Sequence, residues 1–171
     1  MRELNIREGL TPAQIEQLID HSSSDSQVRK FTSDPKRFAN LESFEKWREK
    51  GRSIYTLVDE AGGLEGIIWL GEEPLPSREF VQEIDAGKYG ITFAIRTYGE
   101  ARGRRLALSF MHEAIARYKK GDKYQGIENK GIWLETYADN APAVKTYERF
   151  DFKQVTKPDE RGRILMILRE E

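Results

Sequence analysis

The segment from Leu134 to Phe152 reads LETYADNAPAVKTYERFDF and carries more information than any other part of the sequence. The apolar residues at its start predict a strand, Asn140 is typical of a residue that opens a helix, and the closing phenylalanine predicts a second strand. On that helix Ala143 and Tyr147 share one face, because residues four apart lie one above the other. We therefore expect the Tyr147 ring to be held by packing, with space for a ligand over the small Ala143 side chain.

A second stretch, from Arg102 to Ala107, reads RGRRLA and lies between a predicted strand and a predicted helix. Backbone N–H groups point outward at a helix N-terminus, where the helix dipole also favours an anion. A small residue such as Gly103 lets a phosphate approach the main chain, and the arginines can add charge-assisted hydrogen bonds. The stretch therefore predicts an anion site, with a solvated basic helix end as the alternative.

The composition excludes several classes of protein. The 171 residues are 38% hydrophobic, which is enough for one sizeable core, so we expect a single domain over residues 1–171. The net charge of −1 gives no global field for nucleic acid or for an anionic membrane. The chain has no cysteine, and its two histidines, His21 and His112, are too far apart in sequence to favour a zinc site or a Ser-His-Asp triad. We expect a cytoplasmic protein with no membrane span and no nucleic-acid partner.

The remaining residues predict an alternation of strands and helices. Thr11 and Pro12 open a first helix, and Gln14 completes a capping box. A polar stretch over 21–40 precedes a second helix that Gly51 ends, and Asp151 is expected to close the last helix in a left-handed conformation. The other predicted elements are strands over 4–7, 53–58, 64–70, 89–95, 131–137, 152–156 and 164–168, and helices over 41–50, 104–120 and from residue 140.

The motif from Asn140 to Phe152 and the order of the predicted elements resemble those of the GNAT N-acetyltransferases, and the resemblance covers nearly the whole chain. It implies an α/β fold in which helices flank a mixed, mostly antiparallel sheet that is splayed between its fourth and fifth strands. It also implies acetyl-CoA as cosubstrate, and no metal. Arg105 departs from the family pattern, which usually has glycine there. We expect its N–H to remain available, because a helical backbone would still present it.

The resemblance also implies roles for individual residues. Tyr147 would protonate the departing CoA thiolate, which reference pKa values of about 8.5 for a thiol and about 10 for a phenol make feasible. Glu135, twelve residues earlier, would take a proton from the acceptor amine. Asn140 would orient the pantetheine arm. The remaining cofactor contacts would come from the backbone of Phe93, Ala94 and Ile95 along pantetheine, and from Arg102, Gly103, Arg104, Arg105, Leu106 and Ala107 around the pyrophosphate.

Both catalytic assignments have a structural alternative. A tyrosine on the apolar face of an amphipathic helix, as Tyr147 is, is most often a packing residue with its hydroxyl at the rim. Glu135 follows Trp133 and Leu134, so we expect a largely buried strand, where a carboxylate is unusual. The alternative is a side chain that points to solvent on the other face of the strand.

The sequence therefore predicts direct transfer of an acetyl group from acetyl-CoA to an amine in a ternary complex. A non-catalytic acyl-CoA-binding or sensing protein and a transferase of longer acyl groups are alternatives, and a homodimer is left open. The acceptor is equally open among a peptide N-terminus, a protein lysine, a polyamine and an antibiotic. Acidic residues interspersed with basic ones suggest a cationic amine; the acidic ones are Asp20, Asp25, Asp34, Glu72, Glu73, Glu79, Glu83 and Asp85.

Overall fold

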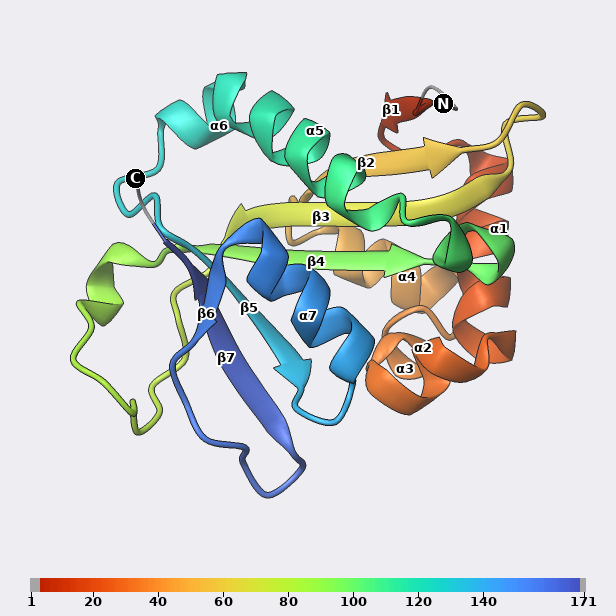
Figure 1. The fold of residues 1–171 in the computed structure, drawn as a ribbon. Coiled ribbons are helices and arrows are strands. Elements are labelled where there is room, and N and C mark those ends of the chain that lie inside the picture. The colour runs from red at the N-terminus through yellow and green to blue at the C-terminus, as the bar shows by residue number, and fades with distance from the viewer. Residues whose placement is uncertain (1–3, 170–171) are drawn as a thin grey trace. The chain divides into compact units, whose positions relative to one another are not determined.

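The structure, a computed structural model, describes residues 4–169 (Figure 1). For Glu100 it describes the backbone but not the side chain. The helices are α1 (Pro12–Ser24), α2 (Ser26–Phe31), α3 (Asp34–Arg37), α4 (Leu41–Arg48), α5 (Ala107–Lys120), α6 (Asp122–Gln125) and α7 (Ala141–Phe150), with short 3-10 turns η1 (Ala86–Lys88) and η2 (Gly99–Arg104). The strands are β1 (Ile6–Glu8), β2 (Ser53–Val58), β3 (Leu64–Glu72), β4 (Ile91–Thr97), β5 (Ile132–Tyr137), β6 (Phe152–Gln154) and β7 (Arg163–Leu168).

The described strands form one mixed sheet in the order β1-β2-β3-β4-β5-β7-β6. The β1–β2, β5–β7 and β6–β7 pairs are antiparallel, whereas β4 and β5 are parallel. The parallel register contains only Ile91 with Ile132 and Thr92 with Trp133, so the pairing ends after the first two residues of each strand. The expected mixed, mostly antiparallel sheet with a parting at its fourth and fifth strands is confirmed.

The contacts divide the chain into two compact units, and β3, β4 and α5 each run from one into the other. Among the described residues, the first unit comprises 4–69 with 95–114, and the second comprises 70–94 with 115–169. Each unit has its own buried residues.

Helices α1 to α4 pack against one another in the first unit. The predicted capping box at Thr11 and Gln14 is confirmed, since both reciprocal hydrogen bonds form. The polar stretch over 21–40, within which no helix was predicted, is mostly helical: α1 continues to Ser24, and α2 and α3 follow. The core beneath it is aromatic, with Phe38 edge-on to the rings of both Trp47 and Trp69.

The two faces of the sheet differ in the second unit. Leu134 is paired with Met166 and lies on the face where Phe152 packs, and Phe152 contacts Tyr147 and Phe150 of α7. The opposite face carries Trp133, Glu135, Leu165 and Ile167, and the segment over 73–89 covers part of it through Leu75, Phe80, Ile84, Ala86 and Tyr89.

The C-terminal end of α7 agrees with the prediction from the sequence, whereas the N-terminal end of α5 does not. Asp151 closes α7 with φ 92°, so the expected left-handed cap is confirmed. The helix expected from residue 104 begins only at Ala107, and η2 occupies the residues before it. Arg105 lies between the two with φ 58° and ψ 33°, which is also left-handed.

Candidate active site

The β4 residues expected to hold pantetheine fall on both units. Phe93 and Ala94 belong to the second unit and Ile95 to the first. The Phe93 side chain is buried, and its ring lies 5.7 Å from that of Phe152. The registered pairing of β4 with β5 has ended before Phe93, so the backbone groups on that edge of β4 are not part of the parallel ladder. Such an edge can pair with an extended ligand through its N–H and C=O groups.

The chain between β4 and α5 forms a 3-10 turn, where the sequence predicted that the helix would begin at residue 104. Residues 99–104 form η2, which begins at Gly99 with φ 51° and is followed by Arg105 in the left-handed region. The expectation that Arg105 has a right-handed helical backbone is therefore wrong. A left-handed arginine costs about 1–2 kcal/mol relative to glycine, and such strain concentrates where a site needs a particular backbone path.

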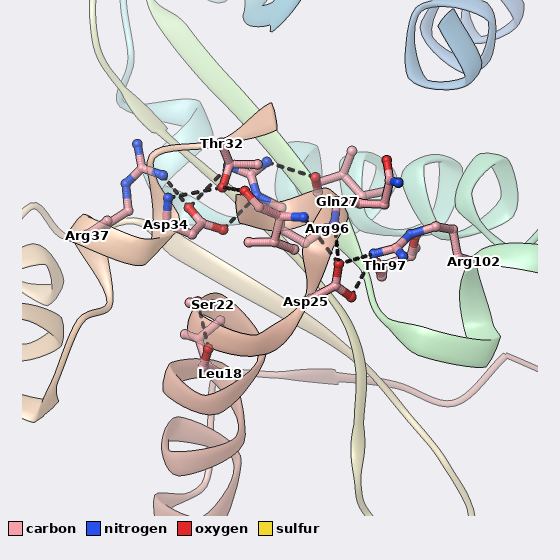
Figure 2. A network of polar contacts seen from close by, with 12 residues as sticks. Leu18, Ser22, Asp25, Gln27, Thr32, Asp34, Arg37, Arg96, Thr97 and Arg102 are labelled. Atoms are coloured by element: carbon pink, nitrogen blue, oxygen red, sulfur yellow. Dashed lines mark hydrogen bonds and ion pairs between the residues drawn. The ribbon is translucent and has the colours of Figure 1, made fainter. Parts of the chain in front are cut away.

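The three arginines of the turn differ in what they contact within the first unit. Arg102 donates from Nη2 to both carboxylate oxygens of Asp25, at 2.9 and 2.8 Å, and to the carbonyl of Thr97 at 2.9 Å (Figure 2). Arg104 lies 3.3 Å from a carboxylate oxygen of Glu65. Arg105 is exposed. Leu106 and Ala107 are half-buried at the start of α5, where the first N–H groups of the helix lack partners within it.

A buried cluster that the sequence did not reveal lies in the same unit. The Asp34 carboxylate is fully buried and accepts from Arg96 Nε at 2.7 Å and from Arg96 Nη2 at 3.2 Å, with Arg37 as a further partner (Figure 2). Both guanidinium groups also lie over the Trp69 ring, at 5.0 Å for Arg96 and 5.5 Å for Arg37. Thus Asp25 and Asp34, two of the acidic residues expected to attract a cationic acceptor, are each neutralised by an arginine.

Tyr98, next to η2, is a second residue that sequence reasoning missed. Its ring stacks on His21 with centroids 4.2 Å apart. Its hydroxyl is buried and has no hydrogen-bond partner among the described residues. Burial and the nearby Asp34 carboxylate raise the pKa of this phenol well above its usual value, so it stays protonated and can only gain by donating to a ligand or water.

In the second unit, α7 presents Tyr147 and Asn140 as expected. Tyr147 is buried, and its ring contacts Phe152 edge-on at 6.1 Å, so its ring is held by packing. Asn140 is the N-cap of α7, but its side chain makes no capping hydrogen bond. Because Asn is favoured at this position for that bond, the amide of Asn140 is available for another partner.

Glu135 is placed differently from the expectation. Its neighbours Trp133 and Leu134 are buried, but the Glu135 side chain is exposed by 33%. The expectation of a buried carboxylate is wrong, because the alternation of the strand turns this side chain outward. One oxygen lies 3.3 Å from Arg163 Nη1 and the other 3.8 Å from Arg78 Nη1. Its role as a base stays a prediction.

Arg78 ties the segment before β4 to the β6–β7 hairpin. It donates from Nη2 to the carbonyls of Lys157 and Arg163, at 3.2 and 3.1 Å. Asp159 lies within 4 Å of both Arg78 and Arg163, which closes a network of two arginines and two carboxylates around Glu135. Hydrogen bonds from the backbone of Arg163 and Arg161 lower the pKa of Asp159, although burial opposes them slightly.

Two classes of site find no support among residues 4–169. They contain no group of three His, Cys, Asp or Glu side chains that could hold a metal ion. None of the helices in this part of the chain is long and apolar enough to cross a membrane.

The comparisons with known proteins rest on structure alone. The sequence matches no protein-family model, and no curated protein matches it. A spermidine N-acetyltransferase from Vibrio cholerae, solved with CoA and spermine, is 16% identical with a TM-score of 0.65, over 96% of this chain and 92% of the other.

Two further solved structures are similar over most of both chains. A GNAT-family acetyltransferase from Streptococcus agalactiae is 15% identical with a TM-score of 0.63, over 99% of each chain. A GNAT-superfamily phosphinothricin acetyltransferase from Sinorhizobium meliloti, solved with acetyl-CoA, is 12% identical with a TM-score of 0.63, over 96% of this chain and 88% of the other. The chain therefore has the fold of the GNAT acetyltransferases.

Proposed function

We propose that this protein is an acetyl-CoA-dependent N-acetyltransferase in which residues 1–171 form a single GNAT domain that works in the cytoplasm. The observation that carries the proposal is the parting of β4 from β5 after Thr92–Trp133, in a fold whose solved neighbours include complexes with CoA and acetyl-CoA. The parting leaves a strand edge for an extended ligand, and the arginine-rich turn follows on the same strand.

The residues present fit acetyl-CoA. The first N–H groups of α5 and the guanidinium of Arg102 would bind the pyrophosphate, as helix N-termini and arginines do elsewhere. The free edge of β4 at Phe93, Ala94 and Ile95 would pair with pantetheine. The side-chain amide of Asn140, which makes no capping hydrogen bond to α7, would orient the pantetheine. Acetyl-CoA supplies the activated acetyl thioester, and no metal is required.

Tyr147 and Glu135 would act on different atoms. They lie on opposite faces of the sheet in the second unit, since Tyr147 packs on Phe152 whereas Glu135 shares the face of Trp133. Acyl transfer needs a proton removed from the amine and another given to the sulfur. We assign the first to Glu135, which is exposed to an incoming acceptor, and the second to Tyr147. A β4 N–H would hold the acetyl carbonyl and stabilise the charge that develops on it.

The acceptor is an amine. Spermine is bound in the V. cholerae neighbour, which favours a polyamine as the first acceptor to try, ahead of a peptide or protein N-terminus. Because Asp25 and Asp34 are paired with arginines, we propose that cationic acceptors are selected by the segment over 73–89, which retains Glu79 and Glu83 as exposed acidic side chains.

Binding and turnover are tested in sequence. Saturating CoA should raise the free energy of unfolding by about 2.7 kcal/mol at a hundredfold excess over Kd. The expected second result is release of free thiol from acetyl-CoA with a pool of amines, followed by mass spectrometry of the products. CoA binding without thiol release would support the acyl-CoA-sensing alternative. Faster release of free thiol from longer acyl-CoA thioesters than from acetyl-CoA would support a transferase of longer acyl groups. Absence of both heat and thermal shift with millimolar CoA would refute the proposal.

A further inference from the structure

Asp25 occupies an unusual position between two helices. Its backbone N–H donates to the carbonyl of His21 and so ends α1, while one carboxylate oxygen accepts from the N–H groups of Gln27 and Val28 and begins α2. The same carboxylate binds Arg102, 77 residues away in the sequence. The Asp25 side chain is exposed by only 8%. A short, buried acid fixed at both helix ends is thus a rigid anchor for a long side chain.

The contact uses only one end of the Arg102 guanidinium. Nη2 has two hydrogens, and Asp25 and the Thr97 carbonyl accept them. Neither Nη1 nor Nε donates to any described residue, and the side chain is exposed by 38%. Arg102 therefore keeps the two hydrogens of Nη1 for an anion while Nη2 is held by Asp25 and Thr97 (Figure 2).

We infer that Asp25 is a positioning residue for the phosphates of the acyl donor: it holds Arg102 in the conformation in which Nη1 faces the pyrophosphate. This inference rests on the proposed function. Fixing a flexible arginine before the ligand arrives lowers the conformational entropy that is lost on binding, and so favours binding. Asp25 itself does not touch the ligand.

The sign of the effect separates this role from simple electrostatics. Asp25 is an anion near an anion site, so removal of its charge should tighten phosphate binding if charge alone matters. If Asp25 orients Arg102, its removal should weaken binding. Asparagine is the suitable replacement, because it caps a helix as well as aspartate does but loses the charge-assisted pair with arginine.

The experiment compares Asp25→Asn with the wild-type protein by calorimetric titration of CoA and of pantetheine, which lacks the phosphates. The Kd for CoA should rise about three- to tenfold, and binding of pantetheine should be unchanged. In turnover, the loss should appear in the KM for acetyl-CoA more than in kcat. Glu16→Gln, which removes the charge of an exposed acid on α1, is the matched control and should leave the Kd for CoA unchanged.

A double-mutant cycle tests whether Asp25 acts through Arg102. In an Arg102→Gln background, Asp25→Asn should have no further effect on the Kd for CoA. Each of three outcomes would overturn the inference: unchanged or tighter CoA binding by Asp25→Asn, an equal loss for pantetheine, or a full additional loss in the Arg102→Gln background. Failure of the wild-type protein to bind CoA would instead refute the proposed function, and the inference with it.

Discussion

The two units each contain a carboxylate held by two arginines, and the two clusters differ in burial and in distance. Asp34, in the first unit, is fully buried, and Arg96 contacts it at 2.7 Å. Glu135, in the second unit, is exposed by 33%, and its arginines lie 3.3 and 3.8 Å away. A buried ion pair at short range is needed for the stability of the fold, because the loss of one partner would leave the other charge buried and unpaired. A loose, solvated pair contributes little stability.

The comparison predicts that losses of turnover without loss of stability arise in the second unit, whereas substitutions in the first unit affect folding or donor affinity. Tyr147→Phe should show the largest effect, because the ring still packs on Phe152 while the proton donor is gone. We expect kcat to fall about 10²–10⁴-fold, with unchanged thermal stability and CoA affinity. Wild-type turnover in this variant would mean that Tyr147 only packs and that another group protonates the thiolate.

Asp34→Ala tests whether the buried cluster in the first unit stabilises the fold. Removing the buried carboxylate leaves Arg96 and Arg37 without their partner, so the free energy of unfolding should fall by about 3–5 kcal/mol. Urea denaturation measures the loss. Asp159→Ala is the matched substitution in the exposed cluster and should cost far less. Equal losses in the two variants would mean that burial does not distinguish the clusters.

The same cluster illustrates what could not be predicted from the sequence. The Asp34–Arg96 pair joins residues 62 positions apart, and no local pattern relates them. No helix was predicted within the polar stretch over 21–40, which is rich in serine and aspartate. In the structure those side chains cap the helices instead, as Asp25 does for α2, while Val28 and Phe38 become buried.

The predictable parts depended on local rules. The Thr11 capping box, the strands, the left-handed Asp151 and the packed Tyr147 ring all follow from spacing or from residue preferences over a few positions. Arg105 was misjudged because its left-handed conformation depends on the turn between β4 and α5, which no preference of arginine indicates. Glu135 was expected to be buried because its neighbours are, but a strand alternates and its neighbours do not determine its own side.

Glu135→Gln should give the next largest effect, a fall of about 10²-fold in kcat/KM near pH 7 that recovers partly at high pH, where more of the amine is already neutral. The loss should be smaller for acceptors with a low amine pKa. Asp159→Asn removes a charge from the same network while keeping the oxygen that accepts from Arg161 and Arg163. It should leave the pH profile unchanged. Identical profiles for wild type and Glu135→Gln would show that the carboxylate only faces solvent.

Asn140→Ala refines the comparison within the second unit. The amide does not cap α7, so its loss should not lower the thermal stability, in contrast to the usual cost of removing an N-cap. The affinity for CoA should fall by about tenfold or less, the worth of one hydrogen bond. A variant that melts earlier and binds CoA normally would assign Asn140 to the fold alone.

The smallest effect concerns the acid stability of the first unit. Burial raises the pKa of Asp25, but hydrogen bonds from Arg102, Val28 and Gln27 outweigh it, so that the pKa is lowered in the folded state. A carboxyl whose pKa is lower in the folded than in the unfolded chain binds more protons when unfolded, so it stabilises the fold above the unfolded value of about 3.9. That contribution is lost as the pH falls through the lower, folded pKa. Asp25→Asn should therefore cost stability at pH 6, and the difference from wild type should shrink below about pH 4. Urea denaturation across this range measures it, and a difference that stays constant with pH would mean that the Asp25–Arg102 pair adds nothing to the stability of the fold.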